Sequence, residues 1–317
     1  MPPFPVSDHC DGERFFNPHA LSGRSVREIV HWMRTRQRAP WPGERPLTQH
    51  DPPPGRVRPG QAAITFIGHS SFLVRTASMT LMTDPVFTSH AGPFGRFGPR
   101  RVRPPAVAPS SLPPIDAVLV SHNHYDHLQP ASLQLFARRA AFVAPLGLGP
   151  IVPRARELDW WQTTRVNDAT ITSVPAQHFS GRTPWDRNRT LWCGYVVSVD
   201  GVTLYFAGDS GYSPCFADIG ARCRPIDVAL LPIGAYEPRW FMEPVHMNPE
   251  DAVRAHLDVK AQVSIGMHFG TFQLTDEGID DPLRALESAR NGAGVAQDAF
   301  RVLDFGETYL ASSAALS

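Results

Sequence analysis

Residues 117–128 read AVLVSHNHYDHL, and this stretch decides the fold. It begins with a short apolar run of the kind that forms a buried strand, and it continues as a loop that holds three histidines and one aspartate. Because side chains alternate along an extended chain, His122, His124 and Asp126 point to one side if the loop stays extended. A turn near Asp126 then brings His127 to the same side.

These four side chains predict a metal site. Neutral imidazoles and carboxylates are the ligands that zinc and similar divalent ions prefer. Four such groups are more than one tetrahedral ion usually takes from a single loop, so we favour two metals that share the site. The alternative is a polar surface loop that happens to be rich in histidine. The metal-type spacing directly after a buried strand argues against that alternative.

Composition sets the broad class of protein. The 317 residues can bury a large core, and the 30 basic and 30 acidic side chains leave no net charge to attract a polyanion. We therefore expect no nucleic-acid partner. The 32 prolines indicate many loops with fixed turns, which suit an enzyme that builds its site from loops at strand ends.

Cysteine usage and the N-terminal sequence bear on location. The four cysteines form no C-x-x-C pair and no disulfide-like framework: they are Cys10, Cys193, Cys215 and Cys223. We expect a reducing compartment. The first residues show no pattern of a signal peptide, and no apolar run is long enough to cross a bilayer. We therefore expect a cytoplasmic protein, with peripheral contact to a membrane left open.

The chain divides into an arm and a main domain. Residues 1–60 form the expected N-terminal arm, in which residues 24–36 have a helical pattern and residues 40–59 read as a proline-rich linker. Residues 61–317 alternate short strands with loops and later helices, and they form the expected catalytic domain.

Further potential ligands follow predicted strands of this domain. They are His178 after residues 169–174, Asp209 after residues 202–206 and His268 after residues 261–265. Together with the loop of residues 122–127 they make seven candidate ligands, which suit two ions that share one carboxylate.

Two other strand-end residues are candidates for supporting roles. Asp84 ends a predicted strand and can orient a metal-bound histidine. His69 lies in a loop between two predicted strands, where it either supports the site or is a satisfied structural histidine. The loop of residues 90–109 is rich in glycine, proline and arginine. It is either a lid that faces the substrate or a solvated basic loop.

The order His-x-His-x-Asp-His, then a later His, an Asp and a final His, resembles the metallo-β-lactamase superfamily. The resemblance implies an α/β (α+β) fold, a four-layer αββα sandwich with the site at the sheet edge. It also implies two ions per chain, zinc first, with iron or manganese as alternatives. In the implied assignment His122, His124 and His178 hold the first ion, Asp126, His127 and His268 hold the second, and Asp209 bridges them.

Several segments narrow the resemblance. They look like the phospholipase D enzymes that hydrolyse N-acylphosphatidylethanolamine, and more distantly like lactonases that act on sugar phosphates. The segments are FFNP (15–18), GHSS (68–71), TDPVF (83–87), HNHYDHL (122–128), GDSGY (208–212), GAYEPRWFM (234–242) and residues 246–250. The implied activity releases N-acylethanolamine and phosphatidic acid by attack of a metal-bound hydroxide.

The resemblance and the metal chemistry together suggest roles for individual residues. Two cations about 3.5–4 Å apart can activate a bridging water and clamp the phosphoryl oxygens of a phosphodiester. Asp209 would orient that water. The catalytic candidates are Asp126, Asp209, His246 and Tyr125, and the substrate-binding candidates are His69, Arg239, Trp240, Phe241 and Met242.

Other functions remain open at this point. One is a two-metal hydrolase of a lactone or of a soluble phosphodiester. Another is a metal-stabilised scaffold that binds a lipid or a partner without turning it over, although a structural site is usually closed by four ligands. The expected partner is a phospholipid or small phosphodiester substrate, and a homodimer stays open.

Overall fold

The apolar run that opens the central stretch becomes strand β4 (Ala117–Leu119), which is buried on both faces. Ala117 and Leu119 belong to the core between two sheets, while Val118 packs on the other side with Leu133. A strand buried on both faces lies inside a layered fold. The computed structural model describes residues 4–20, 24–55, 57–223 and 225–313.

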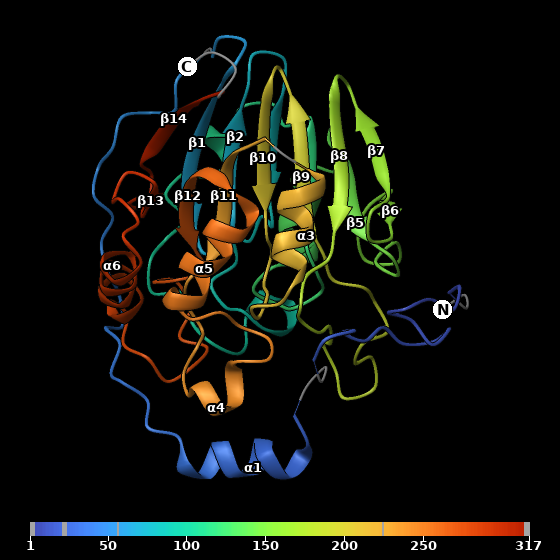
Figure 1. The fold of residues 1–317 in the computed structure, drawn as a ribbon, viewed down its shortest axis with the longest axis vertical. Coiled ribbons are helices and arrows are strands. Elements are labelled where there is room, and N and C mark those ends of the chain that lie inside the picture. The colour runs from blue at the N-terminus through green and yellow to red at the C-terminus, as the bar shows by residue number, and fades with distance from the viewer. Residues whose placement is uncertain (1–3, 21–23, 56, 224, 314–317) are drawn as a thin grey trace.

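Two seven-stranded sheets stack face to face (Figure 1). The order in the first is β14 (Thr308–Ser312), β1 (Gln61–Gly68), β2 (Ser71–Arg75), β3 (Thr80–Thr83), β4, β5 (Ala141–Pro145) and β6 (Arg156–Leu158). The order in the second is β13 (Phe300–Arg301), β12 (Ala261–Met267), β11 (Ile226–Pro232), β10 (Val202–Phe206), β9 (Gly194–Val199), β8 (Ala169–Val174) and β7 (Thr163–Val166).

Both sheets have the same pattern of strand directions. In the first, the pairs from β14 to β3 are antiparallel and the pairs from β3 to β6 are parallel. In the second, the pairs from β7 to β10 are antiparallel and those from β10 to β13 are parallel. The two halves of the sequence each read as strands first and a helix later, without a direct sequence repeat, and the shared pattern of the sheets is consistent with an internal duplication.

Helices cover the outer faces. They are α2 (Pro130–Gln134), α3 (Cys215–Arg222), α5 (Pro249–Val259) and α6 (Asp281–Ala293), with α4 (Arg239–Met242) at one end and the short helices η1 (Pro93–Gly95) and η2 (Pro109–Ser111) in loops. Figure 1 shows α3 and α5 in front of the second sheet. The predicted four-layer αββα sandwich is confirmed.

The N-terminal arm packs on the outside of the sandwich. Phe15 and Cys10 are buried against Trp192. Helix α1 (Val26–Thr35) follows, and Figure 1 shows it beyond α4, apart from the sheets. The linker of residues 40–55 contains no helix or strand, and one of its contacts is the bond from Trp41 Nε1 to the carbonyl of Glu277 at 2.9 Å.

Several predicted elements were wrong in detail. The sequence predicts a helix over residues 130–139, but α2 ends at Gln134. It also predicts a proline-bounded loop at residues 239–242, and these residues form the short helix α4. The sequence predicts residues 300–303 as the closing strand, but β13 covers only Phe300–Arg301, and the later strand β14 pairs with β1. In the described residues no helix has both the length and the hydrophobicity to cross a bilayer, and α6 is the longest with 13 residues.

The arginine-rich loop of residues 90–109 is partly tied down. Arg101 is buried and donates to the carbonyls of Val86 and Thr88 at 2.6 and 3.0 Å. Arg100 pairs with Glu44 on the surface. Arg101 therefore supports the loop from inside and is not a solvated basic side chain.

Candidate metal centre

Asp84 fixes the start of the ligand loop. Its carboxylate accepts hydrogen bonds from the backbone N–H and the hydroxyl of Ser121 at 2.7 and 2.5 Å. The same carboxylate lies 2.6 Å from Nδ1 of His127, and both side chains are fully buried. Because a carboxylate only accepts, His127 donates from Nδ1, and its Nε2 is left to face the centre. This is the orienting contact that the sequence suggested for Asp84.

The first cluster contains three histidines. His124 Nδ1 lies 2.9 Å from His122 Nε2 and 3.1 Å from His178 Nε2. The outer nitrogens have other partners: His178 Nδ1 bonds to the carbonyl of Val245 at 2.8 Å, and His122 Nδ1 to the hydroxyl of Ser121 at 2.8 Å. Since those outer nitrogens donate, the lone pairs of two Nε2 atoms converge on His124. Such convergence fits a cation.

Burial keeps this cluster neutral. It lowers the pKa of His124 to about 3 and that of His178 to about 4, and it lowers the pKa of His122 well below its usual value. Neighbouring histidines lower each of these pKa values further. Neutral imidazole is the form that binds a metal ion.

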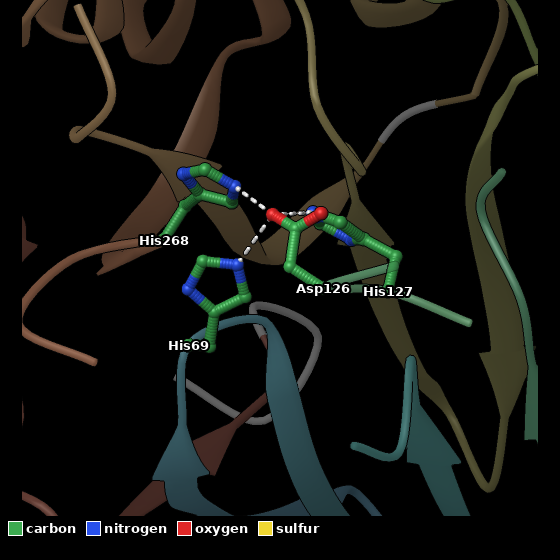
Figure 2. A group of neighbouring side chains, drawn as sticks. All are labelled: His69, Asp126, His127 and His268. Carbon is green, nitrogen blue, oxygen red and sulfur yellow. Dashed lines mark hydrogen bonds and ion pairs between the residues drawn. The ribbon is translucent and has the colours of Figure 1, made fainter. Parts of the chain in front are cut away.

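The second cluster surrounds the carboxylate of Asp126 (Figure 2). Its Oδ2 lies 2.9 Å from His69 Nε2, 3.3 Å from His268 Nε2 and 3.5 Å from His127 Nε2. Asp209 Oδ2 lies 3.0 Å from His268 Nε2 and 3.1 Å from His127 Nε2. The two carboxylates therefore face the same pair of histidines.

Asp209 also reaches the first cluster. Its Oδ2 is 3.9 Å from His178 Nε2, which is the bridging position implied by the family resemblance. Its other oxygen, Oδ1, is buried and has no hydrogen-bond partner in the described part of the chain. A buried carboxylate oxygen without a partner is costly in a folded protein and fits a site that receives an ion or water.

The charges of the second cluster also favour a bound cation. Burial alone would lower the pKa of His127 and His268, but Asp209 and Asp126 raise the pKa of His127 well above its usual value and that of His268 to about 9. Burial alone would raise the pKa of the two aspartates, yet these histidines hold both well below the usual range. Two buried carboxylates thus demand positive charge, which a divalent cation would supply.

The donor set therefore fits two ions. His122, His124 and His178 would hold one, Asp126, His127 and His268 would hold the other, and Asp209 lies between them. All seven residues that the sequence proposed as ligands come together.

His69 lies behind the second cluster. It is buried, its Nε2 faces Asp126, and its backbone carbonyl accepts from the N–H of His268 at 2.8 Å. Burial lowers its pKa to about 3. His69 thus supports two proposed ligands at once, and this contact fits the supporting role considered for it better than direct contact with substrate.

An apolar cavity of about 290 Å³ adjoins the centre. Its wall includes His246, and His246 Nδ1 lies 4.0 Å from Asp209 Oδ2. Phe179 connects the two regions, because it lines the cavity and its ring centroid is 4.5 Å from that of His124. The other lining residues are Arg24, Ile29, Trp32, Arg187, Ala235, Phe241, Met242, Pro244, Val245, Leu274 and Thr275.

Of the four residues 239–242, two line this cavity and two do not. Phe241 and Met242 line it, as expected for substrate-binding residues. Arg239 does not, because it pairs with Asp251 at 2.6 Å and donates to the carbonyl of His246 at 2.9 Å. Trp240 is 43% exposed and lies outside the cavity wall.

Tyr125 and His246 differ in the hydrogen bonds that their side chains make. The Tyr125 hydroxyl donates to the carbonyl of Arg182 at 3.2 Å, and the guanidinium of Arg182 lies 3.9 Å from the ring centroid. His246 Nδ1 is buried without a hydrogen-bond partner among the described residues. Burial lowers the pKa of His246 well below its usual value, so the imidazole is a neutral group beside Asp209.

The sequence reading missed four residues near the site. Asn17 Nδ2 donates to the backbone carbonyl of His178 at 2.8 Å. Arg24 and Trp32 line the cavity, and Asp276 holds the helix that carries Trp32. Of these four residues, Asn17 could have been found from the sequence, because it lies in the FFNP segment. The other three are placed near the site by contacts between distant parts of the chain.

Known proteins share this fold and sequence. The model of the Beta-lactamase superfamily domain matches residues 80–269. An uncharacterized protein of Mycobacterium tuberculosis is 39% identical over 281 residues, which are 85% of this chain and 74% of that protein. The N-acyl-phosphatidylethanolamine-hydrolyzing phospholipase D 1 of Caenorhabditis elegans is 36% identical over 270 residues, which are 78% of this chain and 75% of that enzyme.

A solved structure supports the fold alone. The metallo hydrolase Igni18 from Ignicoccus hospitalis superposes with a TM-score of 0.60 and 24% identity, over 79% of this chain and 98% of that one. The paired sheets and the buried His/Asp centre define a metal-dependent hydrolase. The chain belongs to the metallo-β-lactamase superfamily, as the motif order predicted.

Proposed function

We propose that the chain is a two-zinc phosphodiesterase of the phospholipase D type that cleaves N-acylphosphatidylethanolamine-like lipids. The observation that carries this proposal is the apolar cavity beside the metal centre. Each methylene of an aliphatic chain that such a cavity removes from water makes the free energy of binding more favourable. The phospholipase relative from Caenorhabditis elegans supports the same substrate class.

The charge of the centre also favours a phosphodiester. Two divalent ions carry four positive charges, whereas Asp126 and Asp209 supply two negative ones, so the loaded centre attracts an anion. Bound ions of this kind act as Lewis acids and lower the pKa of water. A neutral lactone gains less from this field than a phosphodiester anion does.

The chain's own residues orient the reactants. Asp209 Oδ1 is available to accept a hydrogen bond from the attacking water. The water oxygen bonds to phosphorus, the bond from phosphorus to the ethanolamine oxygen breaks, and the proton lost by the water ends on that oxygen. His246 Nδ1, buried 4.0 Å from Asp209, is the candidate to carry this proton. Phe241 and Met242 hold the acyl chain.

Product analysis by mass spectrometry tests the proposal. Zinc-loaded protein is incubated with dispersed N-acylphosphatidylethanolamine, beside a chelator-treated sample and beside a panel of lactones and soluble phosphodiesters. We expect metal-dependent N-acylethanolamine and phosphatidic acid. No lipid product from metal-loaded protein, with turnover of a lactone or soluble phosphodiester, would refute the lipid substrate. Turnover of no substrate in the panel would instead favour a binding scaffold.

A matched pair of variants ties the activity to the centre. Asp209→Asn should abolish turnover while the fold is kept, because the amide supplies neither the charge nor both acceptor oxygens. Asp218→Asn makes the same change on the exposed side of α3 and should leave turnover intact. Equal activity of the two variants would contradict the role of Asp209.

A further inference from the structure

Helix α1 forms the outer wall of the apolar cavity. Ile29 and Trp32 line the cavity from α1, and Phe241 faces them from α4. The rings of Trp32 and Phe241 stack with centroids 4.7 Å apart and planes 22° apart. Figure 1 shows α1 lying beyond α4, so the wall is built outside the sandwich. The cavity is therefore bordered on one side by a helix that lies outside both sheets.

This helix has little of its own to hold it in place. None of its residues is buried, and Val26 and Met33 are 77% and 64% exposed. A helix of 10 residues is marginal in water without tertiary contacts. Its position must therefore come from a few specific contacts.

One buried carboxylate, that of Asp276, accepts three hydrogen bonds from α1 and the residue after it. Asp276 is 7% exposed and accepts from Trp32 Nε1 at 3.0 Å. It also accepts from Arg36 Nε at 2.9 Å and from Arg36 Nη2 at 2.7 Å. Charge-assisted bonds of this forked kind fix geometry as well as energy. The residue that lines the cavity and the residue that follows α1 thus share one anchor.

The other end of α1 is attached to α4. Arg24 donates from Nε to the carbonyl of Phe241 at 2.8 Å, and it also donates to the carbonyl of Trp240. Arg24 thus fastens the start of the wall to the element that carries the facing aromatic ring. The two attachments together hold α1 beside α4.

We propose that Asp276 is a positioning residue that fixes α1 as the specificity wall for the acyl chain of the substrate. This inference rests on the proposed lipid activity. A carboxylate buried at this place has no contact with the seven candidate ligands in the described hydrogen bonds and ion pairs. Its effect on turnover therefore passes through Trp32 and the cavity wall.

The test compares a lipid with a substrate that lacks acyl chains. Asp276→Ala removes the side-chain anchor but keeps the backbone bonds of residue 276 to Ala39 and Glu237. We expect KM for dispersed N-acylphosphatidylethanolamine to rise about tenfold or more, the penalty of a lost apolar contact in a pocket. We expect kcat and KM for bis(para-nitrophenyl) phosphate to stay unchanged.

A graded variant and a matched control sharpen the comparison. Asp276→Asn keeps one acceptor oxygen for Trp32 and loses the charge that pairs with Arg36, so its KM should lie between those of wild type and Asp276→Ala. Arg45→Ala breaks another ion pair of the same arm, with Asp280 at 2.6 Å, away from the cavity wall. Arg45→Ala should behave as wild type with both substrates.

Hydrogen exchange supplies a readout independent of turnover. Amides of residues 26–35 should exchange faster in Asp276→Ala, while the sheet amides stay protected. Two results for Asp276→Ala would overturn the proposal. One is an equal loss of activity toward both substrates, and the other is an unchanged KM for the lipid although the amides of residues 26–35 exchange faster. Failure of wild type to cleave the lipid while it cleaves the soluble phosphodiester would instead refute the lipid function itself, before any variant is compared.

Discussion

Asp84→Asn is the change that most directly tests how the centre is built. Asp84 accepts three hydrogen bonds, two from Ser121 and one from His127 Nδ1. An amide has one acceptor oxygen and one donor nitrogen. If its oxygen keeps the bond to the Ser121 N–H, its nitrogen faces Nδ1 of His127. The imidazole must then accept at Nδ1 and carry its proton on Nε2.

That change of tautomer removes a ligand. Nε2 of His127 faces Asp126 and Asp209 at 3.5 and 3.1 Å, and a protonated nitrogen cannot bind a metal ion. Loss of such an orienting partner typically costs about 10–100-fold in metal affinity, or about 1.4–2.8 kcal/mol. Because no unpaired charge is created, the loss of folding free energy should stay at about 1–3 kcal/mol, the cost of a disturbed buried hydrogen bond.

Chelator competition measures the effect. Zinc-loaded wild type and variant are titrated with a chelator, and the retained metal is counted by mass spectrometry. We expect a range of chelator concentrations in which wild type retains two ions and the variant retains one. The control is Asp116→Asn, because Asp116 accepts from the backbone of Thr80 at 2.8 Å, at the opposite end of β3. Unchanged metal affinity in Asp84→Asn, with circular dichroism like that of wild type, would refute the reasoning.

Three further outcomes are expected. Asn17→Ala removes the bond to the carbonyl of His178 and should weaken one site by about 1 kcal/mol, or roughly fivefold, as measured by the absorption of cobalt-substituted protein during chelation. Burial alone would lower the pKa of His9, but its hydrogen bonds with Asp159 and Asp8 raise it above the usual 6.5. The protonated form of His9 therefore stabilises the docked arm fully below pH 6.5, and this contribution is lost as the pH rises through the raised pKa. Proteolysis of the arm should accordingly become faster as the pH rises through that range. His9→Gln should abolish this pH dependence. Chelation should lower the melting temperature, and zinc at 100 times its Kd should restore about 2.7 kcal/mol per ion, as measured by calorimetry.

The ligand loop was predictable because its information is local. His122, His124, Asp126 and His127 lie within six residues, and strand geometry already places three of them on one side. Asp84 was also recognisable, since an aspartate at the end of a buried strand lies at the sheet edge where the loops meet. In such cases the sequence determines both the chemistry and the position.

The cavity wall was not predictable in this way. Trp32 and Asp276 are 244 residues apart, and nothing in either neighbourhood indicates the other. Strand β14 was missed for a related reason: its burial comes from pairing with β1, and only one of its five residues is buried. The alternation that identifies a half-buried strand is therefore weak there.

The two sheets both contribute candidate ligands to one centre. His122 to His127 follow β4 of the first sheet, whereas His178, Asp209 and His268 follow β8, β10 and β12 of the second. All seven donors can meet only when the sheets are packed, so metal binding adds directly to the stability of that packing. Among the described hydrogen bonds, α1 and its flanking residues are attached to Asp276 and to α4, and neither attachment involves one of the seven candidate ligands. The acyl-chain wall that we propose on α1 should therefore tolerate changes that leave the seven candidate ligands in place.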